Sequence, residues 1–81
     1  MYQTINEPIE IAGVYSKSTF TPKKFRWRHK EFLIKTITWR SDVKDGGIRK
    51  RLYSLMSANE LYRVEFNREN ETWSLLEMWI E

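Results

Sequence analysis

The sequence predicts an all-β domain, an antiparallel meander of about six short strands curled into a small barrel or half-barrel. Apolar residues recur mostly with period two, and turn-forming residues separate the alternating runs. Four Trp, four Tyr and four Phe among 81 residues supply large side chains for a core. We expect the sheet to curl because a flat sheet of this size buries too little surface and leaves two open edges.

The N-terminal half predicts three elements. Residues 8–15 alternate isoleucine with polar or small residues and form the first predicted strand, and residues 1–6 before it are expected to be flexible. Residues 24–28 alternate aromatic with basic side chains in a second strand. A tight turn over 28–31 leads into a third strand over 31–40, which is rich in β-branched and aromatic residues.

The C-terminal half predicts a loop followed by three strands. The polar segment 41–50 contains Asp-Gly-Gly, a sequence typical of turns, and is expected to be a loop. Strands are then predicted over 51–57, 61–66 and 72–80, joined by short polar turns.

A short C-terminal helix is the alternative to the last strand. The Ser-x-x-Glu spacing of residues 57–60 is that of a helix capping box, and Trp73, Leu76 and Ile80 lie at helical spacing. Strands are preferred because residues 62–66 alternate strictly.

The predicted last strand is apolar on both faces. Something must therefore cover its second face: the other wall of the sheet, the N-terminal segment or a partner chain. The two faces carry Trp73, Leu75 and Trp79 on one side and Leu76, Met78 and Ile80 on the other.

Length and composition restrict the class of protein. The chain is expected to be one small domain spanning residues 1–81. It has no cysteine, which excludes disulfides and cysteine metal sites. It lacks a signal-peptide pattern and any apolar stretch of the length that spans a bilayer, so we expect a cytoplasmic protein without a membrane partner.

Catalysis is not expected. His29 is the single histidine and falls at a predicted turn tip, where solvent exposure is its simplest role. The serines have no His/Asp partners at a recognisable spacing, and Asp42 and Asp45 are too few ligands for a cation. We therefore predict no catalytic residue, no metal site and no cofactor.

Positive charge is concentrated in the middle of the chain. Residues 1–16, 17–51 and 52–81 carry −2, +9 and −4, for a net charge of +3. Such a segment predicts phosphate contacts with nucleic acid. The alternative is that these side chains form only the solvated face of a strand and the end of a loop. The predicted nucleic-acid-binding residues are Lys23, Lys24, Arg26, Arg28, Arg49, Lys50 and Arg51.

The tryptophans suggest a second kind of function. Trp39, Trp73 and Trp79 cannot all fit inside a small barrel, and aromatic residues left outside favour interfaces. We therefore carry two hypotheses. The first is a non-catalytic accessory nucleic-acid binder, and the second is a protein-interaction or homodimerisation module that uses the Trp-rich last strand.

The order of motifs resembles a family of short bacterial all-β domains of unknown function. That family carries a Phe-x-Trp-Arg hairpin and a Trp-x-Leu…Trp final strand. The resemblance covers roughly residues 7 to 80 and implies a bacterial source but no activity. Some members lie near DNA-repair polymerases, which slightly favours nucleic acid. The chain departs from the pattern at Arg-His-Lys-Glu, where the family has a Gly-Arg turn. The matching residues are Phe25, Trp27, Arg28, Phe32, Trp39, Arg40, Tyr53, Leu55, Trp73, Leu75, Met78 and Trp79.

Overall fold

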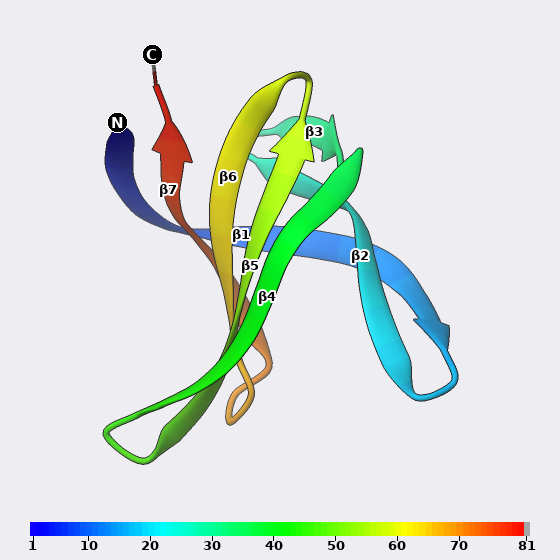
Figure 1. The fold of residues 1–81 in the computed structure, drawn as a ribbon, viewed down its shortest axis with the longest axis vertical. Coiled ribbons are helices and arrows are strands. Elements are labelled where there is room, and N and C mark those ends of the chain that lie inside the picture. Colours follow the sequence, from blue (N-terminus) through cyan, green and yellow to red (C-terminus); the bar gives the residue numbers. More distant parts are fainter. Residues whose placement is uncertain (81) are drawn as a thin grey trace.

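The computed structural model describes residues 1–80, which form one antiparallel sheet of seven strands. This confirms the all-β class and corrects two details, because there are seven strands rather than about six and the sheet is not closed into a barrel. The strands lie in the order β3-β2-β1-β7-β6-β5-β4 (Figure 1). Their bounds are β1 Tyr2–Ser16, β2 Thr19–Trp27, β3 Lys30–Leu33, β4 Thr36–Asp45, β5 Ile48–Ser57, β6 Glu60–Asn67 and β7 Thr72–Trp79.

The long strand β1 joins two parts of the sheet. Its first part pairs with β7 and its second part pairs with β2, and the register shifts between Thr4 and Glu7 and again between Ala12 and Gly13. Figure 1 shows β1 running across the direction of β5 to β7, with the β1–β2 hairpin at the lower right of the view. Because bulges bend a strand and increase its twist, these two shifts curl the sheet. β2 and β3 therefore lie over the face of β5 to β7.

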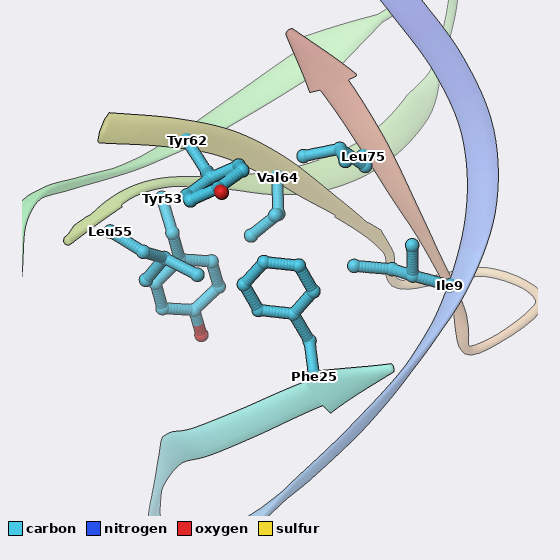
Figure 2. Close-up of a cluster of buried hydrophobic side chains, with 7 residues drawn as sticks. All are labelled: Ile9, Phe25, Tyr53, Leu55, Tyr62, Val64 and Leu75. Atoms are coloured by element: carbon cyan, nitrogen blue, oxygen red, sulfur yellow. The ribbon is translucent and has the colours of Figure 1, made fainter. Parts of the chain in front are cut away.

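The core lies between these two parts of the sheet. Figure 2 shows the ring of Phe25 on β2 directed toward residues of β5, β6 and β7. This ring stacks on Phe32 at 4.8 Å between centroids and meets Tyr62 edge-on at 5.3 Å. The buried apolar residues are Ile9, Phe25, Tyr53, Leu55, Tyr62, Val64 and Leu75, with Trp27, Ile34 and Phe66 half-buried at the margin.

The C-terminal segment is a strand, so the alternative of a helix is wrong. β7 contains a bulge, since Arg63 pairs with Glu77 whereas the next residue, Val64, pairs with Leu75. The extra residue, Leu76, reverses the alternation of side chains along β7. Trp73 and Leu75 therefore face the core on one side of the bulge and Met78 does so on the other. The bulge explains why both odd-numbered and even-numbered positions of this strand are apolar.

Four hairpin turns in the described chain share one unusual conformation. Both central residues have positive φ at Lys17–Ser18, Arg28–His29, Gly46–Gly47 and Ala58–Asn59. Positive φ at both positions defines the type I′ turn, whose twist matches that of the flanking strands. Of these pairs, Gly-Gly has the sequence that such turns prefer. This establishes the turn type at Arg28–His29, whose sequence is not one that such turns prefer.

The structure moves three predicted boundaries. Residues 31–40, predicted as one strand, are divided between β3 and β4 by a corner at residues 34 and 35. Segment 41–50 is not a loop, because β4 continues to Asp45 and β5 begins at Ile48. Residues 2–6, expected to be flexible, belong to β1. The sequence did not predict the β4–β5 hairpin because the residues of this hairpin are largely polar, and an exposed strand does not need an apolar face. In residues 1–80 we find no helix that would suit a membrane span.

Candidate binding cleft

An open cleft of about 480 Å³ lies between the β1–β2 hairpin and the inner face of β5, β6 and β7. Here the inner face means the face of the sheet that carries the core. The hairpin contributes Tyr15 and Phe20, which are cross-strand partners beside the Lys17–Ser18 turn. The facing strands contribute Tyr53, Phe66 and Trp73. Five of the ten residues that line the cleft are thus aromatic.

The rings in the cleft form a continuous row. The centroid of Trp73 lies 4.6 Å from that of Phe66, 5.5 Å from that of Tyr53 and 5.9 Å from that of Phe20. Phe20 in turn lies 5.1 Å from Tyr15. Tyr53 belongs to the core, whereas the Tyr15 side chain at the other end of the row is 76% exposed. The row therefore runs from the buried Tyr53 to the exposed Tyr15, with half-buried rings between them.

Charged side chains border this aromatic row. Arg51 lines the cleft from β5, and Arg68 and Glu71 line it from the β6–β7 turn. The Nε of Arg51 donates a 2.6 Å hydrogen bond to Oδ1 of Asp42 on the neighbouring strand β4. This bond lowers the pKa of Asp42, and the nearby charges of Arg68 and Arg40 lower it further. The same bond raises the pKa of Arg51 against an opposing effect of burial. Asp42 thereby holds the Arg51 guanidinium at the edge of the cleft.

The predicted nucleic-acid-binding residues do not form one basic surface in the cleft. Arg51 lines the cleft, whereas Lys24 and Arg26 belong to a separate shallow hollow on β2. Most of the set is paired with carboxylates: Lys24 with Glu31, Arg28 with Glu7, Arg49 with Glu69, Lys50 with Asp45 and Glu65, and Arg51 with Asp42. Within residues 1–80, Lys23 and Arg26 have no such partner and are exposed.

The best-defined of these pairs joins β1 to the β2–β3 turn. Glu7 accepts hydrogen bonds from Arg28, at 2.6 Å to Nη2, and from the indole Nε1 of Trp27, at 2.9 Å. The Arg28 guanidinium also lies 4.6 Å from the centroid of the Trp27 ring. Arg28 is therefore engaged within the protein, and its charge is partly balanced before any ligand binds.

The three tryptophans of the predicted interface divide between two faces. Trp73 lies in the cleft, whereas Trp39 and Trp79 are 46% and 39% exposed on the outer face of the sheet. Arg63 stands among the outer-face rings, 4.5 Å from the centroid of Tyr2 and 5.9 Å from that of Trp39. Tyr2 meets Trp79 edge-on at 5.1 Å. The outer face thus has an aromatic surface of its own.

The structure brings together no metal-binding cluster among the residues that it describes. His29 is exposed in the Arg28–His29 turn, with a φ of 66°. No three acidic or imidazole side chains in residues 1–80 gather closely enough to hold a metal ion.

Sequence reasoning missed Tyr15, Phe20, Phe66 and Arg68 as site residues. A signal for the hairpin was present, since the polar run Ser-Lys-Ser-Thr separates Tyr15 from Phe20. Nothing local indicates that this hairpin faces Trp73. That contact depends on how β1 crosses the sheet.

The fold and the cleft define a small all-β domain with an open aromatic cleft bordered by arginines. Comparison of the chain with protein-family models, with curated proteins and with solved structures finds no match in any of the three. The resemblance to short bacterial β domains therefore stays a prediction.

Proposed function

We propose that the protein is a non-catalytic binding module that holds single-stranded nucleic acid in the aromatic cleft. One observation carries the proposal: a continuous row of rings from Trp73 to the exposed Tyr15 lies beside Arg51 and Arg68. Proteins that bind single strands combine these two elements. Bases stack on aromatic side chains, and basic groups contact the backbone phosphates.

The shape of the cleft favours a single strand over a duplex. Its volume of about 480 Å³ lies in the range of pockets that hold small organic ligands. Bases stack on protein rings only when they are not already stacked within a helix. A short unpaired segment meets both conditions.

Of the two arginines in this proposal, Arg51 belongs to the set predicted by the sequence and Arg68 does not. Arg51 is held in place by Asp42, so little of its side-chain freedom is lost when it meets a phosphate. Arg68 is exposed beside it. Lys23 and Arg26 retain a role as additional contacts along β2. Lys24, Arg28, Arg49 and Lys50 contribute less, because none of them lines the cleft.

The test is a binding titration with a labelled single-stranded oligonucleotide and a duplex of the same length, each at two salt concentrations. The parent should prefer the single strand and weaken as salt rises, with a log–log slope of about −0.7 per phosphate contact. Tyr15→Ala should weaken binding by roughly five- to a hundredfold, the cost of losing one base stack. Arg68→Gln should flatten the salt slope by about one phosphate contact.

Trp39→Ala is the matched control, because Trp39 is also an exposed ring but lies on the outer face. It should leave the affinity for the oligonucleotide unchanged. The proposal fails if the parent has no affinity for the single strand at low salt, or if Trp39→Ala weakens binding as much as Tyr15→Ala does.

A second candidate function is binding of a protein partner on the outer face. It is favoured by the cluster of Tyr2, Trp39, Arg63 and Trp79, since Trp, Tyr and Arg dominate the energetics of interfaces. Such binding should depend weakly on salt and be lost in Trp79→Ala. Oligonucleotide binding in the cleft should instead weaken as salt rises and should be retained in Trp79→Ala.

A further inference from the structure

Strand β4 is an open edge of the sheet. Thr36–Asp45 pairs with β5 on one side, and no other strand of residues 1–80 pairs with its second side. Figure 1 shows β4, in green, running along the border of the sheet. The opposite edge, β3, is much shorter, with the bounds Lys30–Leu33. A long open edge offers unpaired N–H and C=O groups to another strand.

The turn identifies the backbone groups that are free on β4. Asp45 and Ile48 flank the two-residue turn Gly46–Gly47, and residues that flank such a turn exchange both of their backbone hydrogen bonds. Because the direction of these groups alternates along a strand, the N–H and C=O of Lys44, Asp42 and Arg40 point away from β5. These three residues are also exposed. They form the free edge.

The free edge carries charges of alternating sign, positive at Arg40, negative at Asp42 and positive at Lys44. We propose that β4 pairs antiparallel with β4 of a second copy of the chain, in the register centred on Ser41. In this register Arg40 of each copy lies opposite Asp42 of the other. The two residues form a hydrogen-bonded backbone pair and an ion pair at once, and the two-fold axis makes the contact twice.

The charge pattern selects this register over its neighbours. A register centred on Asp42 brings Arg40 against Lys44 and Asp42 against itself, and one centred on Arg40 brings Arg40 against itself. Like charges directly opposite one another are destabilising. The register centred on Val43 also joins opposite charges, but it places Trp39 opposite Gly47, beyond the end of β4. β4 has a register shift at residue 38, and the register centred on Ser41 overlaps over the regular part of the strand at residues 39–43.

The side chains on the outer face agree with the same register. Trp39 of one copy lies opposite Val43 of the other, and these two side chains are 46% and 37% exposed in the single chain. An aromatic residue and a β-branched residue make a favourable cross-strand pair. Asp42 already binds Arg51, but its side chain remains 51% exposed, which leaves room for Arg40 of the second copy.

The test measures mass in solution by sedimentation or light scattering over a wide range of protein concentration. The parent should rise from 9.9 kDa toward twice that mass. Arg40→Glu should weaken the dimer at least about tenfold, because it replaces two attractive pairs with two repulsive ones. Asp42→Lys should do the same. An equal mixture of the two variants should form a dimer again, since each variant supplies the charges that the other lacks.

Lys44→Glu is the matched control. In the register centred on Ser41 it lies opposite Thr38, so it should leave the dimer intact. Recovery of the dimer in the mixture also shows that both variants fold. The proposal is overturned if the parent stays at 9.9 kDa at every concentration. It is also overturned if Lys44→Glu dissociates the dimer while Arg40→Glu does not. A third contrary result is that Trp79→Ala dissociates the dimer while Arg40→Glu and Asp42→Lys leave it intact.

Discussion

Glu7 on β1 and Trp27 on β2 are joined by a 2.9 Å hydrogen bond in which the indole Nε1–H donates to the carboxylate. The second oxygen of the same carboxylate binds Arg28 at 2.6 Å. One acidic side chain thus ties together a core-margin ring and the turn between β2 and β3. Since the strands concerned form one wall of the curled sheet, this contact helps to hold that wall in place.

The first prediction concerns pH. The hydrogen bonds from Arg28 and Trp27 lower the pKa of Glu7 from its ordinary value of 4.5. The stabilisation is therefore fully present above pH 4.5 and is lost as the pH falls through the lowered pKa of the folded protein. The stabilities of the parent and of Glu7→Gln in urea unfolding should differ at about pH 7 and converge as the pH falls below the lowered pKa of Glu7. A constant difference between the two proteins would contradict this assignment.

The second prediction compares two arginines on the same segment. Arg28 binds Glu7, whereas Arg26 has no ion-pair partner within residues 1–80. Arg28→Gln should lower the free energy of unfolding at neutral pH, and Arg26→Gln should leave it nearly unchanged. The loss in Arg28→Gln should also be absent in a protein that already carries Glu7→Gln, because the partner is then uncharged. Urea unfolding of the four proteins measures this coupling.

The third prediction concerns the core. Leu75 is fully buried in the core cluster, to which β1, β2, β5 and β6 also contribute residues (Figure 2). Leu75→Ala should cost about 2–5 kcal/mol of unfolding free energy, through lost burial and the cavity left behind. Leu33→Ala is the control, because Leu33 is 73% exposed on β3, and it should change stability by less than about 0.5 kcal/mol. Equal effects in chemical denaturation would mean that the core is misplaced.

The fourth prediction concerns Gly13, which lies at the register shift between β1 and β2. A Cβ at Gly13 would lie 2.3 Å from the carbonyl oxygen of Thr21 and 2.7 Å from the ring of Phe20. Gly13→Ala should therefore destabilise the protein by about 1–3 kcal/mol, because backbone must move to admit it. At Gly46 nothing lies within 4 Å, and φ is +57°. Gly46→Asn should thus be tolerated, and thermal unfolding of the two variants checks the contrast.

The fifth prediction concerns the Ala58–Asn59 turn, where both residues have positive φ, 49° and 66°. Alanine pays a steric penalty there, and Asn-Gly is the sequence that type I′ turns prefer. The double substitution Ala58→Asn with Asn59→Gly should raise the free energy of unfolding by roughly 1 kcal/mol. Unchanged or lower stability in urea would show that this turn is not type I′ in solution.

The β class and much of the core could be predicted from the sequence alone. Phe25 and Val64 alternate with polar neighbours, and alternation identifies the buried face of a strand without knowledge of its partners. The same local rule failed where a strand has no apolar face to show. It therefore missed the β4–β5 hairpin around Gly46–Gly47, and it could not detect that Leu76 is the extra residue of a bulge in β7.

Only the tertiary structure decided the path of β1, and with it the cleft. Tyr15 and Trp73 face the same cleft because β1 changes partners from β7 to β2 along its length, and no local pattern encodes that exchange. The ion pairs also depend on the tertiary structure, because the strand register decides which charged residues lie opposite one another. A run of bases in the sequence predicts a positive surface, but whether Arg28 meets a phosphate or Glu7 depends on which carboxylate the neighbouring strand brings opposite it. Alternation is a property of neighbours in the chain, whereas charge balance is a property of neighbours in space.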